Sequence, residues 1–350
     1  MVYKIAVVGS TGKVGREILN ILAEFQSKKN ISVIPLASKK SMGKKISFGD
    51  EELTVLCLED HDFAGIDVAI FCAGSDVSRE YVPLAVDSGC IVIDNTSYFR
   101  MKDGVPLIIP EINEEKIAEY KNQGIISNPN CTTIQMLVAL HLLHKRARIK
   151  RIVASTYQST SGAGKAAMDE LYNQTKKMFM NEVKKADVFP KQIAFNCIPQ
   201  VGEFMESGYT KEEWKMQEET KKILGEDIKV TATCVRVPVF VGHAISLNVE
   251  FHQPITEEVA REILDEAGDK GVLVYDRRDD GGYTTQIDVV QEDAVYVSRI
   301  RKDETVEHGL SMWVVADNLR KGAALNIVQI LEILTNQYLS ANTSKTKIMK

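Results

Sequence analysis

Three glycines that follow a short apolar run near the N-terminus constrain the fold most strongly. Lys4–Val8 is apolar enough for a buried strand, and Gly12–Phe25 has its apolar residues at helical spacing. Between them stands Gly9-Ser10-Thr11-Gly12-Lys13-Val14-Gly15. Glycines at a strand–helix junction permit a tight turn and let a pyrophosphate approach the N–H groups at the helix start. A structural turn would explain one glycine, whereas three at this junction predict a dinucleotide site.

The rest of the first 130 residues continues this alternation of strands and helices. Further apolar runs stand at Ile31–Ala37, Thr54–Leu58, Val68–Cys72 and Ile91–Ile93, and a helix-like segment, Ser78–Ser88, separates the last two. Continuous apolar strands separated by helices are typical of a parallel sheet covered on both faces. We therefore predict an α/β fold with a Rossmann-like first domain over residues 1–130.

After residue 130 the pattern changes. A long amphipathic helix, Thr132–Arg146, precedes a strand at Arg151–Thr156, and later strands alternate more clearly, at Val230–Val237, Ala244–Phe251, Ala294–Arg301 and Ser311–Val315. This pattern predicts a largely antiparallel sheet with helices on one face, forming a second domain over residues 131–320. A last helix, Ala323–Leu339, should lie in a segment of about 321–350 that packs back on the first domain.

Composition and charge exclude several functions. A net charge of −5 gives no general basic surface for nucleic acid. No apolar run approaches the length that crosses a bilayer, and the N-terminus lacks the pattern of a signal peptide, so we expect a cytoplasmic protein. The six cysteines form no C-x-x-C pair and have no histidine at zinc-finger spacing. We expect no metal site, and free thiols of which five are buried apolar residues.

The end of the second predicted strand indicates which dinucleotide binds. Ser38-Lys39-Lys40-Ser41 follows this strand, and no acidic residue stands nearby in the sequence. A carboxylate at this position usually holds the ribose 2′-hydroxyl of NAD, whereas ammonium and hydroxyl groups suit a 2′-phosphate. The sequence therefore predicts NADP(H), with a solvated lysine loop as the alternative.

One cysteine differs from the others in its position. Cys131 follows Asn128-Pro129-Asn130, and Pro129 disfavours helix at the residue before it, so Asn130 or Cys131 should stand at the cap of the long helix. A thiol at a helix start has its pKa lowered by the helix dipole and the unpaired N–H groups, and the thiolate is the nucleophilic form. Cys131 is thus a candidate nucleophile. The alternative is one more buried thiol.

The best candidate partner of this thiol is His243. The histidine begins an apolar strand and shares its inward face, so it is either a reactive group or a satisfied core histidine. Arg236 lies seven residues earlier on an apolar face. A buried arginine needs an anion, which is either a substrate carboxylate or a structural acid.

Four motifs in this order resemble the aspartate-semialdehyde dehydrogenase family. They are Asn130-Cys131-Thr132-Thr133, the segment from Tyr157 to Gly164 (YQSTSGAG), Glu212-Glu213-Trp214-Lys215, and Arg236 with His243. The resemblance extends from Gly9 to the stretch Asn318–Ala323. It implies that the second domain has the glyceraldehyde-3-phosphate dehydrogenase-like C-terminal fold and serves catalysis and dimerisation. It also implies a homodimer or a dimer of dimers.

The resemblance also implies roles for individual residues. Cys131 would be the nucleophile, His243 the acid/base and Gln158 the residue that orients the acyl group. Arg236 and Glu212 would hold the substrate's carboxylate and amino groups, and Arg100, Lys215 and Asn130 its phosphate. Cofactor contacts would come from Gly9, Thr11, Gly12, Lys13, Val14, Ser38, Lys40, Ser41, Ser161, Gly162 and Asn318. One departure is Ala244, where the family commonly has a hydroxyl residue.

Taken singly, several of these residues have ordinary structural explanations. Glu212 and Lys215 would pass for a surface ion pair, and Arg100 for a loop arginine. Thr210 and Glu213 form a capping-box pattern.

The resemblance implies NADPH-dependent reduction of L-aspartyl 4-phosphate to L-aspartate 4-semialdehyde through a cysteine thioester, in the biosynthesis of lysine, threonine, methionine and isoleucine. The alternatives are N-acetyl-γ-glutamyl-phosphate reductase, a Cys–His acyl hydrolase or transferase, and a non-catalytic NADP-binding protein.

Overall fold

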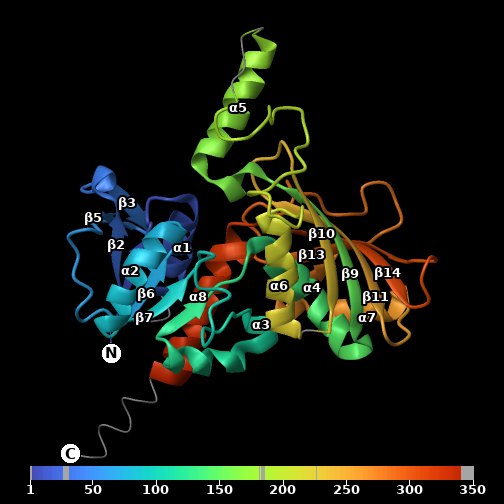
Figure 1. The fold of residues 1–350 in the computed structure, drawn as a ribbon, viewed down its shortest axis with the longest axis horizontal. Coiled ribbons are helices and arrows are strands. Elements are labelled where there is room, and N and C mark those ends of the chain that lie inside the picture. Colours follow the sequence, from blue (N-terminus) through green and yellow to red (C-terminus); the bar gives the residue numbers. More distant parts are fainter. Residues whose placement is uncertain (1, 27–30, 181, 183–185, 226, 340–350) are drawn as a thin grey trace, which may run out of the picture. The chain divides into compact units, whose positions relative to one another are not determined.

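The computed structural model describes residues 2–26, 31–180, 182, 186–225 and 227–339. The chain divides into two compact units, Met1–Pro129 with Ala323–Lys350, called unit 1, and Asn130–Gly322, called unit 2 (Figure 1). Within the described residues, no helix combines the length and apolar character needed to span a membrane.

Unit 1 is built on a six-stranded sheet in the order β5-β2-β1-β6-β7-β8. All neighbouring strands in it are parallel, which confirms the predicted sheet. The chain moves outward from β1 to β2 in one direction and returns to β6 on the other side of β1, and such a reversal is where open α/β sheets bind ligands. The strands are β1 (Tyr3–Val8), β2 (Ile31–Ala37), β5 (Leu56–Cys57), β6 (Val68–Phe71), β7 (Ile91–Asp94) and β8 (Ile125–Ser127).

Helices cover both faces of this sheet. Apolar residues of α1 (Lys13–Gln26) and α8 (Leu325–Ile333) share one core cluster with β1, whereas those of α2 (Ser75–Asp87) belong to a second cluster. The unit also contains η1 (Lys39–Ser41), α3 (Pro110–Asn113) and η2 (Glu114–Asn122).

The prediction of one strand in unit 1 was wrong. The apolar run Thr54–Leu58 divides between β4 (Glu51–Thr54), which pairs with β3 (Lys45–Phe48) as a hairpin, and β5. Gly49 makes the hairpin turn possible, because its φ of +59° is readily adopted only by glycine.

Unit 2 contains a second six-stranded sheet, in the order β10-β9-β11-β14-β13-β12. Its three central pairings are antiparallel, as predicted, but the outer pairs β10–β9 and β12–β13 are parallel. The chain between β9 and β10 includes helices, and a connection of this length lets the two strands run in the same direction. The strands are β9 (Ile149–Gln158), β10 (Lys229–Arg236), β11 (His243–Phe251), β12 (Val272–Val274), β13 (Val295–Lys302) and β14 (Gly309–Ala316).

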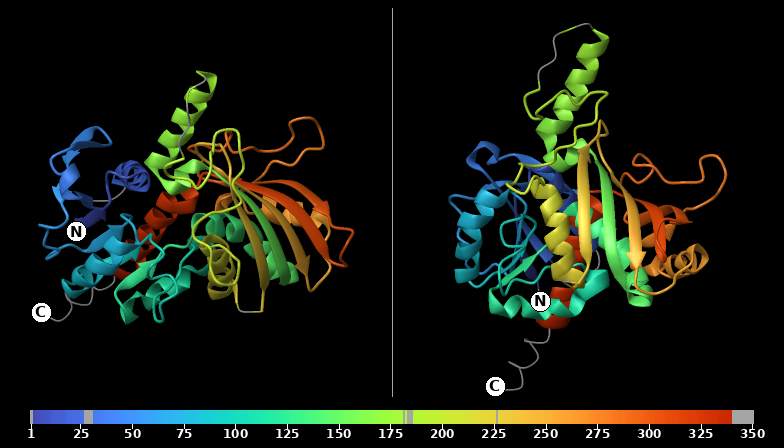
Figure 2. Two further views of the ribbon diagram at one scale, coloured as in Figure 1. Left: turned by 45° about the horizontal axis from the view of Figure 1, so that its top comes forward. Right: turned by 45° about the vertical axis from the view of Figure 1, so that its right-hand side comes forward.

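Helix α4 (Cys131–Ala147) lies at the centre of unit 2, packed against the sheet and against α6 (Lys211–Leu224) and α7 (Glu257–Asp265). It is buried on nearly all sides, so its first residue is held in a fixed place. By contrast, α5 (Lys165–Phe179) projects away from the sheet of unit 2 (Figures 1 and 2). Two short segments, η3 (Thr160–Ala163) and η4 (Gly268–Lys270), complete the unit.

The last helix was predicted as one regular element but contains π-helical turns. The segment Arg320–Ala324 precedes α8 with π geometry, and Leu334–Leu339 follows it in the same way. Wider π turns occur often at functional sites. With these differences, the expected fold class, a Rossmann-like domain joined to an α+β domain, is confirmed.

Candidate active site

Close packing of the backbone requires glycine at two positions of the turn in unit 1. Gly9 has φ of +93°, and a Cβ there would stand 2.9 Å from the backbone nitrogen of Ala73, just after β6. A Cβ on Gly15 would lie 2.2 Å from the carbonyl oxygen of Gly9. Helix α1 begins at Lys13, inside the motif, so its first N–H groups face the turn. This is the arrangement that binds a pyrophosphate.

The predicted 2′-phosphate site stands at the end of β2, beside the glycine turn, because β1 and β2 are parallel neighbours. Lys39 and Lys40 are exposed there. The structure adds Glu59, which follows the neighbouring strand β5. A hydrogen bond from the Cys57 thiol, together with the backbone and charge of Lys39, lowers the pKa of this carboxyl. No acid stands near these residues in the sequence, but the fold brings the Glu59 carboxylate close to Lys39.

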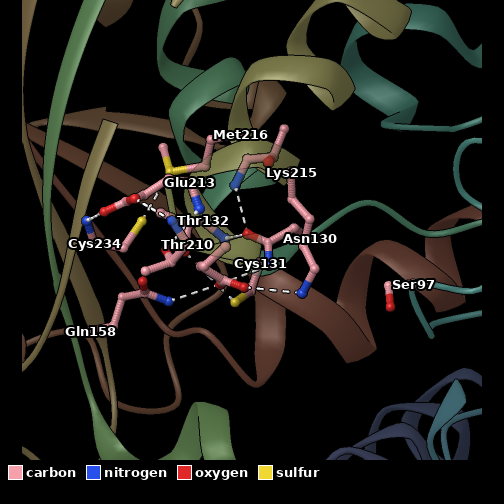
Figure 3. Close-up of polar contacts among 12 residues, drawn as sticks. Ser97, Asn130, Cys131, Thr132, Gln158, Thr210, Glu213, Lys215, Met216 and Cys234 are labelled. Atoms are coloured by element: carbon pink, nitrogen blue, oxygen red, sulfur yellow. Dashed lines mark hydrogen bonds and ion pairs between the residues drawn. The ribbon is translucent and has the colours of Figure 1, made fainter. Parts of the chain in front are cut away.

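In unit 2, Asn130 caps the helix that carries Cys131 (Figure 3). Its side-chain oxygen accepts hydrogen bonds from the backbone nitrogens of Thr132 at 2.9 Å and Thr133 at 3.3 Å. Of the two cap positions that the sequence left open, the structure has Asn130, so the helix begins at Cys131 and the thiol stands on the first turn. A cap of this kind typically contributes about 1 kcal/mol to helix stability.

The carboxylate of Glu212 joins three of the predicted site residues. Its Oε1 accepts from the side-chain amides of Asn130 at 2.9 Å and Gln158 at 3.1 Å. Its Oε2 pairs with the Lys215 ammonium at 3.1 Å. The nucleophile's cap, the predicted acyl-orienting residue and the predicted phosphate contact thus share one acceptor.

The pair between Glu212 and Lys215 is not the surface ion pair that its spacing suggested, because the two side chains are only 9% and 19% exposed. Burial would raise the pKa of Glu212, but the Lys215 charge and the amide donors outweigh it and hold this pKa at about 2. The carboxyl is therefore ionised at neutral pH and acts only as an acceptor.

Sequence reasoning missed Glu219, which also holds the cap. Its Oε2 accepts from the backbone nitrogen of Asn130 at 2.7 Å, and the side chain is buried. Glu212 and Glu219 are seven residues apart, two helical turns, so they lie on the same face of α6. The spacing was visible in the sequence, but nothing in it showed that this face meets the start of α4.

His243 is fully buried at the start of β11, where it pairs with Gln158 of β9. Its Nδ1 is 3.1 Å from both the backbone nitrogen and the hydroxyl of Ser159. Burial and the Arg236 charge lower its pKa to about 3. A Cβ on Gly162 would stand 3.1 Å from both His243 Nε2 and Arg236 Nη1, so both predicted groups border one space.

Arg236 ends β10 with only 6% of its surface exposed. Its Nη1 donates to the carbonyl oxygen of Ser159 at 2.5 Å. Within the described part of the chain it forms no ion pair with a carboxylate, although the Glu212 charge acts on it from farther away. The alternative of a structural acid as its ion-pair partner therefore lacks support, and a guanidinium so placed suits a ligand anion.

Hydrogen bonds to Asn318 join the loop after β9 to the start of β11. Its Oδ1 accepts from the hydroxyls of Ser159 at 3.1 Å and Ser161 at 3.0 Å, and from the backbone nitrogen of Gly242 at 3.0 Å. The predicted contacts of Asn318, Ser161 and Gly162 with a cofactor stay predictions, but these residues do lie together.

The other cysteines differ from Cys131 in their surroundings. Burial raises the pKa of Cys72 to about 12 and that of Cys90 to about 11, and it raises the pKa of Cys234 further. Cys197 is exposed and Cys72 is only partly buried, so the expectation that all five are buried was wrong. Cys131 is partly exposed and packs closely on the backbone of unit 2.

The residue that packs closely against Cys131 is Gly322, which lies in the π-helical segment Arg320–Ala324. A Cβ on Gly322 would stand 2.9 Å from the Cβ of Cys131, a distance that would force one of them to move. The glycine therefore makes room for the thiol-bearing residue, a role that sequence reasoning missed.

Arg100 belongs to unit 1. It is buried, and its Nη2 donates to the carbonyl oxygen of Asn95 at 2.8 Å. It is thus a loop arginine whose side chain is held by a hydrogen bond to the backbone. Its predicted contact with phosphate stays a prediction.

Two family models match the chain. One, the semialdehyde dehydrogenase NAD binding domain, matches residues 4–120, and the other, the semialdehyde dehydrogenase dimerisation domain, matches residues 140–321. The chain is 50% identical over 337 residues to aspartate-semialdehyde dehydrogenase of Rickettsia bellii, covering 96% of this chain and 99% of that one. It is also 50% identical over 343 residues to the enzyme of that name from Aquifex aeolicus, with the same coverage.

Solved structures agree with these matches. Aspartate semialdehyde dehydrogenase II from Vibrio cholerae, complexed with ASA, is 44% identical with a TM-score of 0.93, covering 97% of this chain and 99% of that one. Aspartate semialdehyde dehydrogenase with NADP from Candida albicans is 25% identical with a TM-score of 0.75, covering 96% and 99%.

Proposed function

Since the chain belongs to the aspartate-semialdehyde dehydrogenase family, we propose that it reduces L-aspartyl 4-phosphate to L-aspartate 4-semialdehyde and catalyses the reverse reaction. The observation that carries this proposal is the position of Cys131, on the first turn of a helix whose cap is bonded to Glu212. The same carboxylate binds Gln158 and Lys215, so a nucleophile and two polar groups for a substrate are held together.

The chemistry starts with the thiolate of Cys131. It attacks the acyl carbon of the acyl phosphate, the carbon–oxygen bond to phosphate breaks, and a thioester forms. NADPH, when bound, supplies the hydride that reduces the acyl carbon. The resulting thiohemiacetal breaks its carbon–sulfur bond, which releases the semialdehyde and restores the thiolate. Gln158, at the end of β9, is the side chain proposed to orient the acyl group.

Charged groups of the site match the substrate's own charges. We assign the α-carboxylate to Arg236, because a guanidinium binds such an anion through two hydrogen bonds. Glu212, ionised at neutral pH, takes the amino group. Lys215 and Asn130, with Arg100 of unit 1, take the phosphate.

Unit 1 carries a nicotinamide dinucleotide site, as its family model and glycine turn indicate. We propose NADP(H) as the preferred cofactor because Lys40 is exposed beside Ser38 and Ser41 at the end of β2. The carboxylate of Glu59 lies nearby and would repel a 2′-phosphate. The preference for NADP over NAD is therefore a quantity to measure. Ser161, Gly162 and Asn318 are proposed as contacts contributed by unit 2.

We further propose that unit 1 serves as the NADP-binding domain and that unit 2 serves catalysis and dimerisation. The match of residues 140–321 to a dimerisation domain supports a homodimer. Light scattering on the purified protein distinguishes it from a dimer of dimers. A cytoplasmic location stays a prediction from the sequence, which cell fractionation tests.

A direct spectrophotometric assay tests the reaction. Purified protein is mixed with L-aspartate 4-semialdehyde, NADP and phosphate, and nicotinamide absorbance is followed. We expect sustained NADPH formation only when phosphate is present, because without phosphate the reaction stops at the thioester. Reduction that proceeds equally without phosphate, or none with it, contradicts the proposed reaction.

A further inference from the structure

Glu213 of α6 is a buried carboxylate whose two oxygens bind two different elements (Figure 3). Its Oε2 accepts a hydrogen bond from the backbone nitrogen of Thr210 at 2.7 Å, at the start of α6. Its Oε1 accepts from the backbone nitrogen of Cys234 at 2.9 Å, on β10. The capping-box pattern of Thr210 and Glu213 is thus confirmed. A capping box uses only one of these oxygens, so the bond to Cys234 needs a separate explanation.

The bond to Cys234 lies on the outer edge of β10. This strand stands at the end of the strand order, with β9 on its other side. Successive N–H groups of a strand point to opposite edges, so those of Cys234 and Arg236 point to the same one. There the backbone of Arg236 exchanges two hydrogen bonds with Ile198, at 2.8 and 2.9 Å. Glu213 therefore holds the same edge two residues before Arg236.

Side-chain packing between α6 and β10 supports this link. The sulfur of Met216 lies 3.7 Å from the sulfur of Cys234, and both residues are buried. Glu213 and Met216 are three residues apart on the helix, so one face of α6 meets Cys234 twice. A contact between sulfurs allows sliding, whereas the hydrogen bonds of a carboxylate are directional. Glu213 is thus the contact that fixes the register of the helix against the strand.

The residues beside the two ends of this link are those assigned to the substrate. Glu212, which precedes Glu213, is assigned to the amino group. Arg236, two residues after Cys234, is assigned to the α-carboxylate. In the substrate both groups are bonded to the same carbon, so Glu212 and Arg236 bind them together only at one separation.

We propose that Glu213 is a positioning residue, which sets the separation of Glu212 from Arg236 and so makes the site select substrates with an amino group beside the carboxylate. This inference rests on the proposed function. Glu213 acts through the backbone of Cys234 and through its own place on α6, without contact to the substrate. The alternative is that Glu213 serves only as a helix cap, in which case it affects stability and not selectivity.

Two semialdehydes that differ only in the amino group isolate this effect. L-Aspartate 4-semialdehyde uses both Glu212 and Arg236, whereas succinate semialdehyde, which lacks the amino group, uses Arg236 alone. The measured quantity is the ratio of their kcat/KM values, followed as NADPH formation in the presence of phosphate. A general disturbance of the fold or of Cys131 lowers both values and leaves their ratio unchanged.

Glu213→Asp is the principal variant. It keeps the negative charge at the helix start, but its side chain is one methylene shorter and cannot reach Thr210 and Cys234 together. We expect the ratio to fall roughly tenfold, because small misplacements of binding groups are costly. Glu213→Gln, which keeps the length, is the second variant. Its amide places an NH₂ against one of the two N–H groups, and it should lower the ratio in the same direction.

Thr210→Val is the matched control. It removes the hydroxyl that accepts from the backbone nitrogen of Glu213 at 3.4 Å and leaves both bonds of the carboxylate in place. It should lower the urea midpoint of unfolding, as the loss of a cap does, and keep the ratio within about twofold of wild type. A ratio that falls as far in Thr210→Val as in Glu213→Asp overturns the proposal.

The wild-type protein separates this inference from the proposed function. Absence of phosphate-dependent activity with L-aspartate 4-semialdehyde overturns both. An active wild type without a preference for this substrate over succinate semialdehyde, or Glu213 variants that keep the wild-type ratio, overturn the inference alone.

Discussion

The glycine turn of unit 1 and the Glu212 cluster of unit 2 are built in opposite ways. The turn is seven consecutive residues in which missing side chains let backbone atoms approach. The cluster joins side chains from the N-cap of α4, from β9 and from α6, which come from three separate parts of the sequence. A local turn depends on sterics at each position, whereas the cluster depends on one shared acceptor. Substitutions in the two regions should therefore have different effects on the kinetics.

The largest expected effect is at the shared acceptor. Glu212→Ala leaves Asn130, Gln158 and Lys215 without their common partner, so several groups move at once. We expect kcat/KM to fall by about 10² or more, because a displacement near 1 Å can cost that much. Steady-state kinetics with the semialdehyde measures it.

The matched control is Glu218→Gln, which alters a neighbouring carboxylate on α6 that pairs with Lys221. It should stay within about twofold of wild type, as surface changes usually do. If Glu212→Ala behaved like this control, the cluster would not be an organising feature of the site.

Acid should weaken the cluster through the same carboxylate. The folded pKa of Glu212, about 2, lies below its ordinary value of 4.5. Its contribution is therefore complete above pH 4.5 and lost as the pH falls towards 2, and amounts to about 3 kcal/mol at most. Urea unfolding of wild type and Glu212→Gln should show a stability difference that shrinks across this window. A constant difference would mean that the charge of Glu212 is not what stabilises the fold.

The turn should respond to a single methyl group. Gly15→Ala places a Cβ 2.2 Å from the carbonyl oxygen of Gly9, so the turn must move. We expect the KM for the nucleotide to rise roughly tenfold, because the pyrophosphate loses its close approach to the backbone. Alkylation of Cys131 in unit 2 should keep its rate.

Gly268→Ala serves as the control, since a Cβ there meets nothing closer than 4.0 Å. It should change neither the KM for the nucleotide nor the alkylation rate. A rise in KM of the same size in this control would show that the effect of Gly15→Ala is not local.

The smallest effect concerns the choice of nucleotide. Lys40→Glu reverses an exposed charge at the end of β2, and we expect the preference for NADP over NAD to fall about tenfold. Lys45→Glu, on β3, is the control for a charge change elsewhere in unit 1. An unchanged ratio of kcat/KM for the two nucleotides would remove Lys40 from the proposed 2′-phosphate site.

The two regions also differ in how well the sequence predicted them. The glycine turn, the parallel sheet of unit 1 and the helix start at Cys131 follow from residues that are neighbours in the chain. Motif order brought Glu212 and Lys215 to attention, but spacing alone suggested an exposed ion pair. Their burial depends on how α6 packs on α4, which local sequence does not encode.

The same reason explains the residues that were missed. Glu219 meets Asn130 only because two helices touch, and Gly322 makes room for Cys131 from a turn far along the chain. Glu59 reaches the basic strand end because β5 joins the sheet beside β2. Each contact is created by tertiary packing, and none has a local pattern that would have distinguished it from an ordinary surface or loop residue.

Trapping the covalent intermediate tests the central claim, that Cys131 on its capped helix is the nucleophile. The protein is incubated with L-aspartate 4-semialdehyde and NADP without phosphate, quenched in acid and digested, and its peptides are weighed by mass spectrometry. We predict an aspartyl group on the peptide that contains Cys131, absent from Cys131→Ala. An aspartyl group on another cysteine, or turnover by Cys131→Ala near the wild-type rate, would contradict the account.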